Sequence, residues 1–194
     1  QRGYVGQGVE HAKGSDEADL KEFWQVGQPT PSAGCDPEEF PPNQAVTELD
    51  SFKPSVVDAF QAMEATGQHM LRAIARFLEL DPNYFKPWVT GGNSILRAIH
   101  YPPIRTAPKD AVRAGQHEDI NLITLLVGAS ADGLEVLRKD GTWIAVTALP
   151  DHIVVNVGDM LQRLTNHRLK STTHRVVNPA QQLWHLPRFS MPFF

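Results

Sequence analysis

The chain has 194 residues, 41% hydrophobic and 21% charged, which suits one soluble-type globular domain with a substantial core. Its net charge is −4 and it has no dense cluster of Lys and Arg, which argues against nucleic acid or an anionic membrane as a partner. No apolar run approaches the roughly 18 residues of a membrane span, and the single Cys35 cannot form an internal disulfide, so we expect a cytoplasmic protein.

The N-terminal half predicts an irregular arm followed by a long helix. Residues 1–50 are rich in Gly and Pro and predict a draped arm with one or two short strands. Residues 55–79 predict an amphipathic helix, with Pro54 near its start and Pro82 beyond its end. A second helical turn is expected over residues 83–88. The predicted apolar face of the long helix consists of residues at helical spacing: Val56, Phe60, Met63, Met70, Ile74 and Phe77.

From residue 94 onward the pattern changes to short strands. The strands are predicted over residues 95–101, 121–127, 134–138, 143–147, 153–157, 172–177 and 184–193. Turn pairs separate several of them: Asp132-Gly133, Asp140-Gly141 and Gly158-Asp159. Many short strands at regular spacing indicate a sandwich or barrel. We therefore predict a mainly β protein with flanking helices, in which a double-stranded β-helix (jelly roll) core packs against the long helix.

Three side chains form a candidate metal site: His117 and Asp119 in one segment, and His174 much later in the chain. In a strand, residues two apart share a face, so His117 and Asp119 can converge on one ion while Glu118 points away. His174 must come from another strand, and a jelly roll brings such strands side by side. Two imidazoles and one carboxylate are the ligands of a non-haem Fe(II) site with open positions for oxygen and a cosubstrate.

A candidate anion anchor follows the second histidine. Arg188 and Ser190 share a strand face, and a guanidinium beside a hydroxyl can hold a carboxylate by charge-assisted hydrogen bonds. An arginine in so apolar a strand would be costly to bury without an anionic partner. That partner could equally be a structural carboxylate of the core, and the residues alone leave both interpretations open.

The whole pattern resembles the isopenicillin N synthase-like branch of the Fe(II)/2-oxoglutarate-dependent dioxygenases, from about residue 8 to the last residue. The His-x-Asp, His and Arg-x-Ser elements are weak alone but specific in this order. The matching segments are residues 19–26, 96–97, 100–103, 115–119, 122–126, 133–136, 155–159 and 170–176.

The resemblance implies a role for each candidate residue. The His-x-Asp pair and His174 would bind iron, and Arg188 and Ser190 would hold the distal carboxylate of 2-oxoglutarate. The hydroxyl of Tyr101 would assist them. Relatives often have an Asn two positions before this tyrosine, where this chain has Ile99, so that contact is expected to be absent or replaced.

The resemblance also implies an activity and a domain plan. It predicts an oxidoreductase that uses Fe(II), 2-oxoglutarate and O2, and couples decarboxylation to succinate and CO2 with hydroxylation, desaturation or cyclisation of a small organic substrate. Family members are longer at both ends, so we expect one domain over residues 1–194 that lacks the terminal family segments. Residues 1–93 would be arm and helical support, and residues 94–194 the core with the metal site.

Three other functions stay open at this point. Relatives that do not use 2-oxoglutarate keep both the triad and the Arg-x-Ser pair, so a 2-oxoglutarate-independent iron oxidase is possible from the motifs. A zinc hydrolase could use the same ligands but needs a placed general base, and Glu118 is expected to point away. A non-catalytic jelly-roll binding module with a structural metal would need a closed coordination sphere.

Overall fold

The computed structural model describes residues 2–11, 16–30, 35–147, 149 and 151–194, so the predicted arm over residues 1–50 includes positions outside the described ranges. The chain divides into two units. The first holds the residues up to Gly3, residues 25–96 and Phe193, and the second holds residues 4–24, 97–192 and Phe194. The predicted division of a single domain after residue 93 stays a prediction.

The first unit is built on the long helix α1 (Phe52–Phe77), which was predicted over residues 55–79. It ends before Asp81-Pro82, because a carbonyl of its last turn accepts a hydrogen bond from a residue beyond the helix end. The N–H of Leu80 donates to Ala75 O at 2.9 Å, and Glu79 has a φ of 62°. A residue in the left-handed conformation, followed by an N–H that donates to the carbonyl five residues earlier, is a common way for a helix to end.

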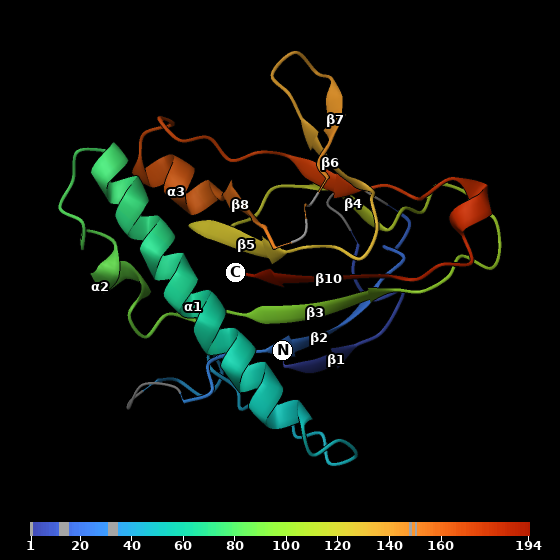
Figure 1. Ribbon diagram of the computed structural model, residues 1–194, viewed down its shortest axis with the longest axis horizontal. Coiled ribbons are helices and arrows are strands. Elements are labelled where there is room, and N and C mark those ends of the chain that lie inside the picture. The colour runs from blue at the N-terminus through green and yellow to red at the C-terminus, as the bar shows by residue number, and fades with distance from the viewer. Residues whose placement is uncertain (1, 12–15, 31–34, 148, 150) are drawn as a thin grey trace. The chain divides into compact units, whose positions relative to one another are not determined.

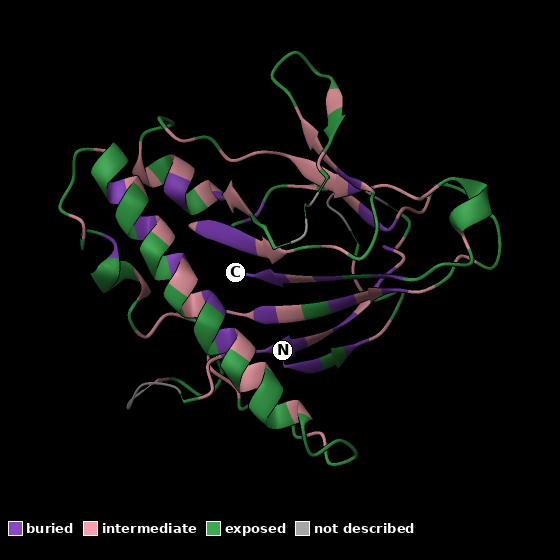
Figure 2. Ribbon diagram, viewed as in Figure 1, coloured by how far each residue is buried: buried purple, intermediate pink, exposed green. Residues whose placement is uncertain are grey.

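One face of α1 is buried, as the purple segments in Figure 2 show. The prediction that Phe77 belongs to this face is wrong, because its side chain is 63% exposed. It lies two residues, or about 200° of helical rotation, beyond Ala75. The predicted turn over residues 83–88 corresponds to helix α2 (Lys86–Val89). That α1 packs against the β-core stays a prediction. The buried residues of α1 are Phe60, Met63, Gly67, Leu71 and Ala75.

Two sheets form the β structure, and the mainly β jelly-roll prediction is confirmed (Figure 1). The six-stranded sheet has the order β1 (Gly3–Val5), β2 (Glu22–Val26), β3 (Leu96–Tyr101), β10 (Arg188–Phe193), β5 (Ile123–Val127), β8 (Ile153–Val157). The four-stranded sheet has the order β4 (Ala114–His117), β9 (His174–Val176), β6 (Leu134–Leu137), β7 (Trp143–Ala145). Most of each strand belongs to the second unit.

Alternating side chains from both sheets fill the core of the second unit. Inward-facing positions recur every second residue, which is why the apolar residues of these strands gather on one side. None of the helices in the described stretches combines the length and apolarity that crossing a bilayer would require. The core cluster consists of Val5, Phe23, Ile99, Tyr101, Ala114, Leu134 and Val176.

Two local predictions are corrected by the structure. The Gly158-Asp159 pair is not a turn between strands, because Gly158 is extended and helix α3 (Asp159–Leu164) begins directly after it. The last strand begins at Arg188 rather than at residue 184. A short 3-10 helix (Gln181–Leu183) ends directly before residues 184–187, and Pro187 has no N–H with which to extend the ladder.

Candidate metal centre

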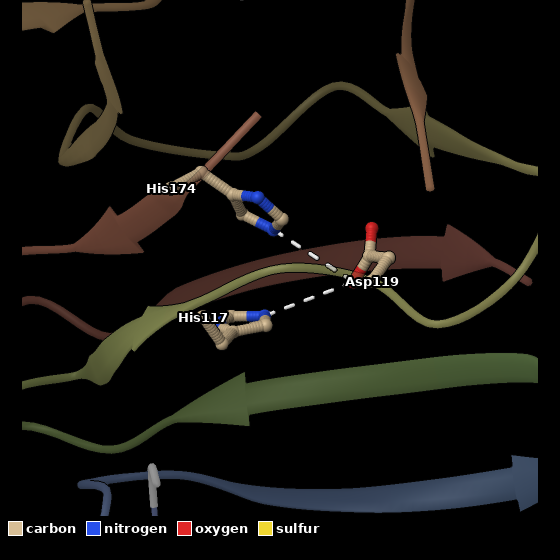
Figure 3. Close-up of side chains that lie close together, drawn as sticks. All are labelled: His117, Asp119 and His174. Carbon is tan, nitrogen blue, oxygen red and sulfur yellow. Dashed lines mark ion pairs between the residues drawn. The ribbon is translucent and has the colours of Figure 1, made fainter. Parts of the chain in front are cut away.

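Three ligand atoms converge where β4 meets β9. His117 ends β4 and is the register partner of His174, which begins β9. Asp119 Oδ1 lies 3.8 Å from His117 Nε2 and 3.9 Å from His174 Nε2, and the carboxylate faces both imidazoles in Figure 3. Two ligands bound to one ion at about 2.1 Å can be at most about 4.2 Å apart. These separations suit a shared ion, and this is the one such His/Asp/Glu/Cys group among the described residues.

The hydrogen bonds of both imidazoles leave Nε2 free to bind a metal. Nδ1 of His117 lies 2.8 Å from Gly115 O, and Nδ1 of His174 lies 3.0 Å from Thr172 O. Since a carbonyl only accepts, each Nδ1 carries a proton, and Nε2 is the ring nitrogen that is available to a metal. Burial lowers the pKa of His117, and the neighbouring His174 lowers it further. The ring is therefore held neutral, which is the form that binds metal ions.

Asp119 lies outside the strand that the sequence predicted for it. β4 ends at His117, so alternation along a strand does not place the carboxylate. Instead the N-terminus of α3 holds the loop: Asp159 N–H donates to Asp119 O at 2.8 Å, and Met160 N–H donates to Ile120 O at 3.2 Å. Free N–H groups at a helix start bind such carbonyls readily. The predicted convergence is present, but a helix that the sequence reading missed produces it.

The orientation of the Asp119 carboxylate comes from two residues that the sequence reading did not single out. Thr124 Oγ1 donates to Asp119 Oδ2 at 2.6 Å, and Asn156 Nδ2 donates to the same oxygen at 2.8 Å. Thr124 and Asn156 are register partners on β5 and β8. With Oδ2 occupied, Oδ1 is the oxygen that faces the histidines. In the sequence, Thr124 and Asn156 are each a polar residue within an apolar strand, and this feature could have singled them out.

All six predicted site residues line one cavity of about 110 Å³, here called the triad cavity. This volume is several times the roughly 30 Å³ of a water molecule. Besides the triad, the cavity is lined by Tyr101, Arg188 and Ser190, which are 2%, 1% and 7% exposed. The predicted anion anchor and the predicted metal site therefore face the same space.

Arg188 has no carboxylate within ion-pair distance among the described residues. Its Nε donates to Ala131 O at 3.0 Å, its Nη1 lies 3.5 Å from Ser190 Oγ, and its guanidinium lies 4.9 Å from the Tyr101 ring centroid. Burial lowers the pKa of Arg188, and interactions with Tyr101 and with the charge of Asp132 oppose this. The alternative of a direct structural salt bridge is thus not realised in the described part of the chain, and a buried cation faces the triad cavity.

Two further cations line the triad cavity. Lys21 Nζ lies 2.8 Å from Glu10 and 2.7 Å from Asp19, while Arg97 lies 3.2 Å from Glu10 and 4.1 Å from the ring centroid of Phe23. Both cations are therefore paired with carboxylates of the chain itself.

Two imidazole nitrogens and one carboxylate oxygen on a jelly-roll core are typical of non-haem iron oxygenases, and these donors fit Fe(II). Residues 92–194 match the 2OG-Fe(II) oxygenase superfamily, and the chain belongs to this family. Its members use Fe(II), 2-oxoglutarate and dioxygen.

Individual relatives agree with this family. The chain is 49% identical to a 2OG-Fe(II) oxygenase family protein of Caulobacter crescentus, with a TM-score of 0.87 over 100% of this chain and 62% of the other. A Neurospora crassa protein crystallised at full length with alpha-KG is 35% identical, with a TM-score of 0.85 over 100% of this chain and 63% of the other. The 2-oxoglutarate-Fe(II) type oxidoreductase ppzC of Metarhizium rileyi is 35% identical over 99% of this chain and 56% of its own length. The chain therefore spans little more than half of this curated relative.

Proposed function

We propose that the chain is the core of a Fe(II)/2-oxoglutarate-dependent dioxygenase acting on a small organic substrate. Decarboxylation of 2-oxoglutarate to succinate and CO2 would be coupled to hydroxylation, desaturation or cyclisation of that substrate. The observation that carries the proposal is the triad cavity, where three metal-ligating side chains and the buried cation of Arg188 face one space. The relatives named for 2-oxoglutarate support the same cosubstrate.

In this proposal the chain's own residues bind the metal and 2-oxoglutarate and orient them. His117, Asp119 and His174 would hold the metal, which when loaded with 2-oxoglutarate and dioxygen supplies the oxidising chemistry. Arg188 would hold the distal carboxylate of 2-oxoglutarate by charge-assisted hydrogen bonds, with Ser190 as a further donor. Tyr101, whose ring lies against the guanidinium, would fix the direction of Arg188.

Six aliphatic side chains form part of the remaining wall of the triad cavity and would exclude water there. A dry pocket strengthens each electrostatic contact and limits side reactions. No side chain is required to transfer a proton in this proposal, so the protein's contribution is ligation, orientation and desolvation. The aliphatic walls are Ile99, Leu126, Leu134, Val136, Val154 and Val176.

The alternative functions are less well supported. A 2-oxoglutarate-independent iron oxidase is not favoured, because the relatives carry 2-oxoglutarate in their names or crystals. A zinc hydrolase would need a general base in the cavity, and Glu118 instead accepts a 2.8 Å hydrogen bond from Thr173 on an exposed side. A non-catalytic module with a structural metal would leave the buried cation of Arg188 without a purpose.

Partners and location belong to the same proposal. Crystals of the Neurospora crassa protein hold alpha-KG with thymine, and another relative, 37% identical, is named a proline hydroxylase, so the names of these relatives point to small molecules of differing chemistry. We expect a small-molecule substrate here and neither nucleic acid nor membrane as a partner. The thiol of Cys35 is free, in keeping with a cytoplasmic location.

An anaerobic titration with Fe(II) and then 2-oxoglutarate tests the proposal through the visible metal-to-ligand charge-transfer band. Wild type should develop the band, and His174→Ala should not. Arg188→Met should need more than about 10-fold higher 2-oxoglutarate, because it loses a buried charge-assisted anchor. Arg138→Met removes an arginine that is 58% exposed and outside the triad cavity, and should behave as wild type.

Two results would contradict the proposal. A band of wild-type strength in His174→Ala would remove the metal-ligand assignment. Equal 2-oxoglutarate affinity in wild type and Arg188→Met would remove the anchor assignment, while leaving the metal site in place.

A further inference from the structure

A second, larger cavity lies beside the triad cavity in the same unit. Its volume is about 540 Å³, and it shares Leu126, Leu134 and Arg188 with the triad cavity as lining residues. Its remaining lining comes mainly from two segments, residues 129–135 and 177–186. We call it the Arg113 cavity, after the buried cation in its wall.

Arg113 is only partly satisfied by the protein. It is 2% exposed, and its Nη2 donates to Leu186 O at 3.1 Å. Its guanidinium lies 6.0 Å from the Tyr101 ring centroid. Its Nε is buried and has no hydrogen-bond partner among the described residues. An unmet donor on a buried charged group is costly, so this N–H is well placed for an acceptor that enters the cavity.

The charges around the cavity favour an anion. Arg113 and Arg188 both line it, and burial followed by the charge of Arg188 lowers the pKa of Arg113. Of the two carboxylates in the lining, Glu135 is engaged by Arg175 at 2.8 Å and Asp132 is exposed to solvent. Neither forms an ion pair with Arg113 in the described structure. Two buried cations therefore face one space with no carboxylate seated between them.

The rest of the cavity wall is apolar and reaches the surface. Leu183 and Leu186 are 49% and 45% exposed, so the cavity opens to solvent at their side. A ligand that satisfies such a site has a negatively charged end and an aliphatic or aromatic body. The other apolar lining residues are Leu126, Leu134, Val146, Val177 and Pro179.

We propose that the Arg113 cavity is a second ligand site, separate from the metal centre, that binds a small organic carboxylate. The carboxylate accepts from Arg113 Nε, and the apolar body packs against the aliphatic wall. The site does not require iron, 2-oxoglutarate or turnover. Its test therefore stands apart from that of the proposed function.

Calorimetric titration of the metal-free protein with hexanoate tests the proposal. Wild type should bind hexanoate saturably. It should bind hexan-1-ol, which has the same apolar body without the charge, at least about 10-fold more weakly, since a charge-assisted contact is lost. Arg113→Met should bind hexanoate at least about 10-fold more weakly than wild type, because the same charge-assisted contact is lost. Arg113→Lys should retain part of the affinity. Arg138→Met, which removes an exposed arginine outside the cavity, should bind as wild type.

Changes in the amide chemical shifts of wild type on addition of hexanoate locate the bound ligand. This measurement does not depend on whether Arg113→Met folds. Shifts that cluster in residues 129–133 and 178–186 support the proposal. Shifts that cluster at Thr124, Thr172 and His174 would place the ligand in the triad cavity and overturn it. The absence of saturable binding, equal affinity for hexan-1-ol, or wild-type affinity in a folded Arg113→Met would also overturn it.

Discussion

At Asp119, two hydrogen bonds decide which carboxylate oxygen faces the histidines. Oδ2 accepts from Thr124 at 2.6 Å and from Asn156 at 2.8 Å, so Oδ1 is left toward the two Nε2 atoms. The Asp119 side chain is only 6% exposed, and little water reaches it to replace a lost donor. Replacing residues that orient a ligand in this way typically lowers metal affinity by about 10- to 100-fold.

Removing either donor should weaken metal binding without removing a ligand. Thr124→Val and Asn156→Leu should each lower the affinity for Mn(II), a redox-stable probe, by about 10- to 100-fold. Electron paramagnetic resonance of free Mn(II) measures the loss. Thr142→Val removes a similar hydroxyl bond, to Asp140 at 2.6 Å, in an exposed turn and should leave the affinity unchanged. Unchanged Mn(II) affinity in both cavity variants would show that the carboxylate needs neither donor.

At the level of elements, the short helix α3 positions the loop that carries Asp119. Its first N–H groups bind the carbonyls of Asp119 and Ile120, and Gly158 lies against the loop at Asn121. A Cβ on Gly158 would clash with the backbone oxygen and the side-chain Oδ1 of Asn121. A glycine is required here for close approach rather than for an unusual φ, since Gly158 has a φ of −98°.

Gly158→Ala should therefore disturb stability and the metal site together. The added methyl forces the loop and α3 apart, which should lower the free energy of unfolding by about 1–3 kcal/mol and weaken Mn(II) binding. Thermal unfolding and the Mn(II) titration measure the two effects. Gly6→Ala is the matched control, because its Cβ would meet its nearest neighbours at an ordinary 3.6 Å. If Gly158→Ala bound Mn(II) as wild type does, α3 would not position Asp119.

At the scale of the whole molecule, residues 4–24 belong to the unit that carries the metal centre, although residues 25–96 separate them in sequence. An ion cluster of the buried Lys21 and Asp19 with the partly exposed Glu10 holds them there. Lys21 contacts Glu10 at 2.8 Å and Asp19 at 2.7 Å, and Asp19 accepts from Gly115 N–H at 2.8 Å. Burial disfavours the ammonium of Lys21, but its two carboxylate partners outweigh burial and raise its pKa.

Lys21→Met should destabilise the protein and change its response to acid. At neutral pH the variant removes the cation of the buried Asp19 and leaves Glu10 with Arg97 alone, which should cost about 3 kcal/mol. Burial acts to raise the pKa of Glu10, but Lys21 and other cations lower it below its ordinary value of 4.5. The unfolded chain then binds more protons near that pH, so this stability is lost as pH falls below 4.5.

Chemical denaturation across pH 3–7, a range of about four units around the ordinary carboxyl pKa, measures both effects. The acid-dependent loss of stability should be less steep in Lys21→Met than in wild type. Lys139→Met, at an exposed position in the turn between β6 and β7, should match wild type throughout. Parallel pH profiles for Lys21→Met and wild type would show that the cluster does not couple to protonation.

The strands and the candidate site residues could be predicted from the sequence, because apolar alternation and residue type are recognised without knowledge of the tertiary contacts. Alternation of apolar residues predicted most strands of the core, and residue type with chain order singled out His117, Asp119, His174 and Arg188. The six-residue helix α3 was missed, because one and a half turns carry too little periodicity and a Gly-Asp pair also begins turns.

The fold class, the family and the residues that chemistry singles out could be predicted from the sequence, because these depend on residue types and on patterns along the chain. How those residues act depends on contacts that only the folded chain makes. The pairing of Thr124 with Asn156, the capture of the Asp119 loop by α3, and the second cavity at Arg113 each join segments far apart in sequence. Such contacts depend on strand register and packing, which arise only when the chain has folded.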